Sequence, residues 1–544
     1  MIIPNALLGS YLVSAMIMSL PLVAFGVFLN NDIKMPLDEQ SRFYATIFLP
    51  WSFKPLYSYA MEHYPICGSR RRFYIITGNV GLGACFLLTA LFATNTLEMY
   101  LLSFARSAFE ALAECGYGLT LIDIVGKERV QGSDAAQLGQ ARTTTARMAG
   151  SLSSFVLGLL LYGCGGSTLR SLSSRTIIGM TSVLCLVQVG FAFALPEKRS
   201  GVVDTDFQEE EAAGETEPVS WTIRSRVLVA LGALSFQFCF VWIGVQSLVS
   251  IIPWIIVFLL SILAVSFMGI IAMVRSRVPW VPIASAALMF IMHATPGYGS
   301  SWFSFKLYAL NGSSCAMQIL LVVGEIGSLT GSWLYPRLAN MYLDSTITEK
   351  ADKKMRAQQA MVFFTITACI AGMLDVFLAI DWEQYPYMDQ ISSGIRFGIV
   401  SLIGGFLGQL SQISRQVFVT EHSYDNKQLN SAITPGVLYG IYLSLIDFAD
   451  SASGWITAPI MSALNLSYTN QSFSLLWVLV VIAMASNLLV VLLIPPALDM
   501  MGRWLATKQQ VQYNVVGQGE QLLPSSAAGD VAVELQDDGR LARV

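Results

Sequence analysis

Apolar residues gather in long runs along the chain, and most runs extend over about 20 residues. A helix of that length crosses the roughly 30 Å hydrocarbon core of a bilayer. Charged residues separate the runs and place the helix ends between them. The pattern predicts an all-α polytopic membrane protein with fourteen spans, near 6–29, 43–61, 73–93, 97–125, 139–163, 176–195, 227–247, 250–274, 281–308, 314–336, 360–380, 396–419, 432–464 and 473–495.

Two polar segments suggest how these spans are grouped. Residues 196–226 are rich in Asp and Glu and poor in apolar side chains, which is typical of a disordered linker. We expect this acidic linker to follow an N-terminal six-helix half at 1–195. After it, the pattern predicts an accessory helix pair at 227–274, a C-terminal six-helix half at 275–495 and a disordered tail at 496–544.

The distribution of Lys and Arg predicts which side of the membrane each loop faces. Short loops on the cytosolic side carry an excess of these residues, and Arg70-Arg71-Arg72 is the densest such cluster. The glycosylation sequons at Asn311, Asn465 and Asn470 all fall in loops on the opposite side. Both termini, the linker and the tail are therefore expected in the cytosol. We expect the plasma membrane as the location, with an organellar membrane as the alternative.

Composition narrows the function classes. The chain is 54% hydrophobic and 12% charged, whereas soluble proteins are about a quarter charged. Its 32 basic and 36 acidic residues are too balanced for a nucleic-acid partner. The eight cysteines contain no C-x-x-C pair and the three histidines form no ligand cluster, so we expect no metal, no cofactor and small packing roles for the cysteines. No nucleophile-and-base motif predicts a membrane enzyme.

Three charged residues in the span 97–125 share one helix face. Arg106, Glu110 and Glu114 are four residues apart, so their side chains stack along one stripe. Together they would cost about 8 kcal/mol if they faced lipid, so we expect them to line the interior or a cavity. The alternative is a self-neutralised pair of Arg106 and Glu110, with Glu114 satisfied by a neighbouring helix.

Other charged residues also lie inside predicted spans. Arg147 and Lys306 lie deep enough to hold an anionic solute, and Asp447 and Asp450 are three residues apart on one face. Such a carboxylate pair raises the proton affinity of each member, so either is a candidate proton carrier. Further arginines lie near span ends, where we expect them to snorkel to the headgroups: Arg142, Arg396 and Arg415.

Two proline-glycine pairs fall within apolar spans, Pro296-Gly297 and Pro435-Gly436. Unwound backbone at membrane depth is tolerated mainly where it lines a cavity, so both pairs point to a binding site. Simple helix kinks are the alternative.

A motif between the second and third spans resembles a known family. The string LPWSFKPLY at residues 49–57 is followed by Glu62 and by PICGSRRR at residues 65–72. This pattern resembles the folate-biopterin transporter family of the major facilitator superfamily. The likeness continues at Asp123, at residues 147–151 and 294–297, and as far as 434–437. It departs where the family has an aspartate in place of Glu62 and an acid in place of Leu438.

The resemblance implies a latch on the cytosolic side, in which Glu62 pairs with Arg70, Arg71 and Arg72. Binding of the arginines to lipid headgroups is the alternative for this triplet. Lys54 lies inside a span, so we expect it to face protein or water, either at the gate or in a structural pair.

The resemblance further implies a major facilitator fold and a secondary active transporter that moves folate or a pteridine by alternating access. Proton coupling is a further expectation, with the site formed by residues already introduced: Arg106, Glu110, Glu114, Arg147, Lys306, Asp447 and Asp450. The alternatives are another organic solute (S-adenosylmethionine, a nucleoside or an amino-acid-like compound) and a receptor or scaffold that does not transport. The expected partners are a small-molecule solute, a proton and the lipid bilayer.

Overall fold

The computed structural model describes residues 3–130, 135–164, 172–195, 288–342, 350–384, 390–423, 435–468, 470 and 472–493. This part of the chain is almost entirely helical, and within it β-structure is limited to two isolated bridges. The predicted linker, accessory helix pair and tail at 196–226, 227–274 and 496–544 lie outside the described residues. Predictions for those three segments remain predictions.

The first two predicted spans are composite helices. In the first, α1 (Asn5–Ser19) leads into α2 (Leu22–Val27) and a π-helical turn (Phe28–Asp32), with Pro21 at the joint. In the second, α3 (Leu37–Ile47) passes through a 3₁₀ turn (Leu49–Phe53) into α4 (Lys54–His63). Single helices follow: α5 (Arg72–Phe92), α6 (Thr96–Val130), α7 (Ala135–Leu161) and α8 (Ser174–Ala194).

The later spans begin with a broken helix. Residues 288–293 are helical, 294–298 are not, and α13 (Gly299–Ala309) follows, so the break predicted at Pro296-Gly297 is confirmed. Pro435 and Gly436 are both helical in α17, and residues 424–434 before them lie outside the described residues, so the second predicted break stays a prediction. The remaining helices are α14 (Ser314–Tyr342), α15 (Lys350–Gln384), α16 (Gln390–Ser423), α17 (Pro435–Ala463) and Leu476–Leu493.

Helix lengths agree with a polytopic membrane protein. Each predicted span outside 227–274 contains helix in the described residues, and eight helices are long and apolar enough to cross a bilayer. Large apolar side chains such as Leu91, Leu186 and Phe377 are exposed on the bundle, as expected for a surface that faces lipid. The prediction of an all-α membrane protein is confirmed.

Close helix contacts in the bundle depend on glycine. A Cβ atom on Gly150 of α7 would lie 2.1 Å from the carbonyl oxygen of Leu12 on α1. A Cβ atom on Gly405 of α16 would lie 2.2 Å from the carbonyl oxygen of Gly324 on α14. Both are backbone contacts that no side chain fits, and such small-residue interfaces are typical of membrane helices.

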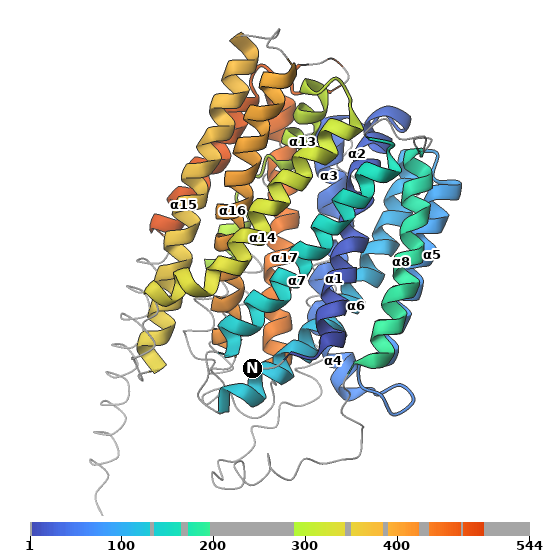
Figure 1. Cartoon of the computed structure of the whole chain (residues 1–544), viewed down its shortest axis with the longest axis vertical. Coiled ribbons are helices and arrows are strands. Elements are labelled where there is room, and N and C mark those ends of the chain that lie inside the picture. The colour runs from blue at the N-terminus through green and yellow to red at the C-terminus, as the bar shows by residue number, and fades with distance from the viewer. Residues whose placement is uncertain are drawn as a thin grey trace, which may run out of the picture. The chain divides into compact units, whose positions relative to one another are not determined.

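Contacts of α7 and α17 join the earlier spans to the later ones. The helices α7 and α14 pack against each other along the bundle, and α17 packs against α3 and α4 (Figure 1). We name the ends of the bundle by helices labelled there. At the α4 end, α4 ends at His63 while α7 and α17 begin; at the α13 end, α7 ends at Leu161 and α14 begins.

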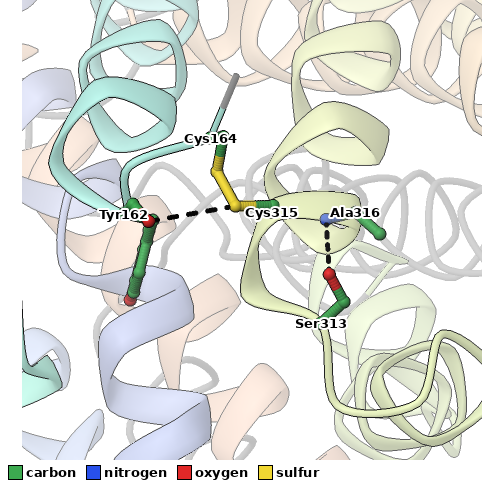
Figure 2. Close-up of a disulfide and its surroundings, with 5 residues drawn as sticks. All are labelled: Tyr162, Cys164, Ser313, Cys315 and Ala316. Carbon is green, nitrogen blue, oxygen red and sulfur yellow. Dashed lines mark hydrogen bonds between the residues drawn. A yellow bond between two sulfur atoms is a disulfide. The ribbon is translucent and has the colours of Figure 1, made fainter. Parts of the chain in front are cut away.

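A disulfide closes the α13 end between α7 and α14. Cys164, three residues after α7, is bonded to Cys315, the second residue of α14 (Figure 2). Next to it, Ser313 Oγ accepts the amide N–H of Ala316 at 3.2 Å and caps the start of α14. The expected packing role is therefore wrong for these two cysteines. It holds for four buried ones: Cys85, Cys115, Cys185 and Cys369.

Candidate functional site

A cavity of about 240 Å³ lies between the earlier and later helices. The α7 residues on its wall run from Gln140 to Arg147, and the α17 residues run from Tyr439 to Asp450. Each stretch belongs to the half of its helix nearer the α4 end, so the cavity is displaced from the disulfide. Ionisable or aromatic side chains on the wall include Tyr11, Trp51, Lys54, Glu114, Arg147, His293, Arg415, Asp447 and Asp450.

Glu114 and Arg147 form an ion pair on one wall. Arg147 Nη2 donates to Glu114 Oε2, and Ser14 Oγ of α1 donates to the other carboxylate oxygen. The Arg147 guanidinium carbon also lies 4.7 Å from the centre of the Tyr11 ring. The Glu114 side chain is 6% exposed and that of Arg147 is 32% exposed. The carboxylate is therefore satisfied inside the protein, while the guanidinium still reaches the cavity.

A second ion pair joins the two sets of helices. Lys54 Nζ, at the start of α4, lies 2.7 Å from Asp447 Oδ2 on α17. Lys54 Nζ also lies 4.5 Å from the centre of the Trp51 ring in the preceding 3₁₀ turn. Both side chains are mostly buried, which agrees with the expectation that Lys54 faces protein or water and not lipid.

A three-residue hydrogen-bonded chain forms a further part of the wall. His293 Nδ1 lies 2.9 Å from Asp450 Oδ1, and His293 Nε2 lies 3.0 Å from Arg415 Nη1. A guanidinium has only donors, so Nε2 must accept from Arg415 and the ring proton must sit on Nδ1, where it is donated to Asp450. The ring is therefore neutral in this arrangement. Asp450 is 57% exposed, so its carboxylate is accessible from the cavity.

Arg106 and Glu110 share a helix with Glu114 but lie away from this cavity. The Arg106 guanidinium carbon is 4.7 Å from the centre of the Phe25 ring and 5.4 Å from that of Phe86. Glu110 is buried, at 6% exposure. Each four-residue step advances about 6 Å along the helix. The stripe therefore runs from the cavity towards the α13 end, and Glu114 is its member on the cavity wall.

Lys306 lies in a separate polar cluster among the later helices. Its Nζ donates to Ser401 Oγ at 3.4 Å and lies 5.5 Å from the centre of the Trp302 ring. Asp375 is near Lys306 and accepts a hydrogen bond from Tyr298 Oη at 2.8 Å. The structure does not bring Lys306 to the wall of the cavity described above.

The arginine triplet contacts helices of its own half. Arg71 Nη1 lies 2.8 Å from Asp123 Oδ2 on α6, and Arg72 Nη2 donates to the carbonyl oxygen of Leu195 at 3.2 Å. Arg70 is exposed. The Glu62 side chain lies outside the described side chains, so the latch between it and the triplet stays a prediction.

Comparison with known proteins assigns the chain to a family. The model of the BT1 family matches residues 16–387, more than half of the sequence. The chain belongs to the BT1 family. A folate-biopterin transporter from Synechocystis sp. (strain ATCC 27184 / PCC 6803 / Kazusa) is 26% identical over 207 residues. That alignment covers 38% of this chain and spans only 38% of the relative's length.

Solved structures show the fold of this BT1-family chain. The xylose transporter XylE from E. coli, in a partially occluded inward open conformation, matches with a TM-score of 0.52 at 12% identity. That match covers 90% of this chain and 97% of XylE. The nucleoside transporter NupG matches with a TM-score of 0.50 at 14% identity, over 91% of this chain and 98% of NupG. The major facilitator fold and the expected family are confirmed, and relatives named as transporters agree with the expectation that the chain is not an enzyme.

Sequence reasoning overlooked two residues in the cavity of this BT1-family protein. Arg415 was expected to snorkel at the end of a span, but α16 continues to Ser423 and places it on the cavity wall. His293 is one of the three histidines that form no metal-ligand cluster, so the sequence indicates no role for it. Its signal was its position directly before the predicted break at Pro296-Gly297, because a helix that ends at membrane depth presents its last residues to a cavity.

Proposed function

We propose that this chain is a secondary active transporter that moves folate or pteridine-type solutes across a membrane by alternating access. The observation that carries the proposal is the cavity between the two sets of helices. Among the described residues on its wall are three cations (Lys54, Arg147, Arg415) and three carboxylates (Glu114, Asp447, Asp450). Charged groups at membrane depth are costly and are typical of substrate or ion pathways. The name of the Synechocystis relative supports the cargo class.

The wall carries the chemistry that a folate or pteridine requires. The amino and ring N–H groups of the heterocycle are donors, and Asp450, at 57% exposure, offers acceptors for them. Arg147, at 32% exposure, offers paired donors to the carboxylates of a folate tail. Tyr11 and Trp51 supply aromatic faces beside these groups. Lys306, Arg106 and Glu110 then act away from the cargo, in support of the helices that carry the site.

Cavity size fits a site that must open to admit a whole folate. Pockets for drug-sized ligands occupy roughly 300–1,000 Å³, and this cavity of about 240 Å³ is smaller. Separation of the two sets of helices at the α4 end would enlarge it. The pairs that hold this end together are Lys54 with Asp447, and Gln140 Nε2, which donates to Thr420 Oγ1 at 2.9 Å.

The organisation proposed from the sequence is part of this account. Two six-helix halves at 1–195 and 275–495 move about the cavity, with the linker, the accessory helix pair and the tail attached to them. We assign the α4 end to the cytosol. The disulfide at the other end supports this orientation, because disulfides persist outside the reducing cytosol. Glu62 and the arginine triplet are the proposed latch of the cytosolic side. The plasma membrane is the proposed location.

Proton coupling is part of the same proposal. A folate dianion that enters a negative-inside cell works against about 2.3 kcal/mol per charge at 100 mV, or about 4.6 kcal/mol for two charges. Accumulation therefore needs a driving ion, and the ionisable groups on the cavity wall suit a proton. Asp447 and Glu114 are each held by a cation that a protonation step would release.

A radiotracer uptake panel tests the cargo. Purified protein in proteoliposomes is offered folate, biopterin, S-adenosylmethionine, a nucleoside and an amino acid in separate assays. We expect uptake of folate or biopterin above that of protein-free vesicles, with each inhibiting the other. Uptake of a different solute would replace the cargo class and keep the transporter. Absence of uptake for every solute would favour a receptor or scaffold.

A further inference from the structure

His293 holds Arg415 in a position that depends on the protonation state of the imidazole ring. Arg415 Nη1 donates to His293 Nε2 at 3.0 Å, and His293 Nδ1 donates to Asp450 Oδ1 at 2.9 Å. The backbone that carries the ring is held in place, because hydrogen bonds tie the non-helical segment after His293 to neighbouring helices. Thr295 Oγ1 donates to Asn487 Oδ1 at 3.0 Å, and the Gly297 amide donates to Thr457 Oγ1 at 2.9 Å.

Protonation of His293 breaks one bond of this chain and keeps the other. A proton added at Nε2 turns the acceptor into a donor and places two cations face to face. The guanidinium cannot give up a proton in exchange, so the bond between Arg415 and His293 is lost. The imidazolium retains Asp450 as its partner. Arg415 Nε stays bonded to the carbonyl oxygen of Ser411 at 3.4 Å, so Nη1 is the donor that is released, and it lies at the cavity wall, where an anion can accept from it.

Anion binding before proton binding couples the two events in the same way. An anionic cargo that binds Arg415 draws the guanidinium away from His293 and exposes the lone pair of Nε2. That lone pair then takes a proton more readily, and the imidazolium adds to the positive potential around the anion. Each ligand therefore tightens binding of the other, and such coupling is necessarily reciprocal.

We propose that His293 is the residue that couples proton binding to anion binding, through its bond to Arg415. This inference rests on the proposed function and assigns a residue to its coupling step. In the neutral state His293 accepts from Nη1 of Arg415. In the protonated state it releases this donor to a carboxylate of the cargo. Asp450 keeps the ring oriented in both states, and His293 acts as a positioning residue for Arg415.

The charged groups around His293 suit this role. His293 contacts Asp450 of α17 and Arg415 of α16, and it shares the cavity wall with Asp447 of α17 and Lys54 of α4, which are paired with each other. The Cys369 thiol of α15 lies near Arg415. Asp450, which accepts from the neutral His293 ring, thus supplies one negative charge to balance one added proton. Imidazole is the side-chain group that suits a proton switch near physiological pH.

The test uses a glutamine at position 293. In His293→Gln the side-chain oxygen can accept from Arg415 and the amide can donate to Asp450, but the group does not titrate. His422→Gln, in the last turn of α16, is the matched control. The full-length proteins are purified in detergent and folate affinity is measured at pH 5.5 and pH 7.5. Allosteric coupling typically changes affinity by about 5–150-fold, so we expect at least about fivefold tighter binding at pH 5.5 for the wild type and control. For His293→Gln we expect less than about twofold.

Each outcome separates the inference from the proposed function. If the wild type tightens at low pH and His293→Gln tightens equally, this inference is wrong and the proposed function stands. If the wild type binds folate with the same affinity at both pH values, the coupling is absent. If it binds no folate at all, the proposed function fails and this inference with it.

A measurement on unaltered His293 guards against misfolding of the variant. In ¹³C-histidine NMR, the 293 signal, assigned with His63→Gln and His422→Gln, should titrate at higher pH with folate than without it; an unchanged titration contradicts the inference.

Discussion

Lys54 Nζ lies 2.7 Å from Asp447 Oδ2, and this ion pair joins α4 to α17 across the cavity. Lys54 belongs to the motif that resembles the folate-biopterin transporter family, whereas Asp447 lies in a late span where the sequence suggests a residue that binds the cargo or carries the proton. The contact gives each charge a partner at membrane depth. It also makes the two residues dependent on each other, because removal of one leaves the other charge buried alone.

The first prediction concerns this pair. Lys54→Gln or Asp447→Asn alone should destabilise the detergent-solubilised protein by on the order of 3 kcal/mol, since a lone buried charge remains. The double variant should recover much of that loss. Thermal unfolding followed by tryptophan fluorescence measures all three proteins. Additive effects of the two single changes would show that the pair is not coupled.

Transport by the same variants tests the coupling role of Asp447. If Asp447 carries the proton, Asp447→Asn should abolish pH-driven accumulation of folate and leave exchange of folate across equal pH. If His293 carries it, Asp447→Asn should reduce both activities together, through the unpaired Lys54. Parallel accumulation and exchange assays in proteoliposomes distinguish the two residues, and an Asp447→Asn protein that still accumulates folate would remove Asp447 from coupling.

Arg147 should discriminate charged from uncharged cargo. A charge-assisted hydrogen bond contributes about 1.5–3 kcal/mol, so Arg147→Gln should raise the KM for folate by about tenfold or more. Biopterin, which has no carboxylate, should be affected less. Arg106→Gln is the control, because Arg106 contacts Phe25 and Phe86 away from the cavity and should lower protein abundance more than it changes KM. Equal effects of Arg147→Gln on both solutes would contradict a role in anion binding.

Cys164 and Cys315 should hold the two halves together covalently. A protease site placed in 196–226 and cut after purification should leave one full-size band on a denaturing gel without reductant. Reductant should release two fragments, since no backbone then connects the halves. Cys164→Ser should give two fragments under both conditions. Separation of the wild-type fragments without reductant would disprove the bond.

The latch prediction concerns turnover and not folding. Glu62→Gln should lower folate uptake about fivefold, the effect of roughly 1 kcal/mol on a two-state equilibrium, at unchanged surface abundance. Glu98→Gln is the matched control, because the Glu98 carboxylate accepts from Thr94, just before α6, and is not part of the proposed latch. Normal uptake by Glu62→Gln would reduce Arg70-Arg71-Arg72 to a topology signal.

Local sequence pattern predicts the helices well, for a physical reason. A bilayer requires long apolar helices with internally satisfied backbones, so run length alone indicates most spans. The break near Pro296-Gly297 was also predictable, because proline cannot continue the hydrogen-bond ladder. The same dipeptide at Pro435-Gly436 is helical in the described residues, so the dipeptide alone does not reveal where the backbone unwinds.

Partners across the fold were not predictable from local pattern. The four-residue spacing placed Arg106, Glu110 and Glu114 on one face, yet the rise along the helix brings only Glu114 to the cavity wall. Arg415 and His293 come from separate helices, and their contact depends on helix packing. The disulfide between Cys164 and Cys315 likewise has no spacing signal, because it joins the segment after α7 to the first turn of α14, which packs against α7.

Proton-driven folate uptake by the unaltered protein is the most direct test of the account. Proteoliposomes with a neutral interior are diluted into acidic or neutral buffer containing radiolabelled folate, with and without a protonophore. The account predicts accumulation above equilibrium only with acid outside, and its loss when the protonophore collapses the gradient. Folate uptake that is identical under all conditions would contradict the proton coupling, and an absence of folate and biopterin uptake in every condition would contradict the proposed cargo.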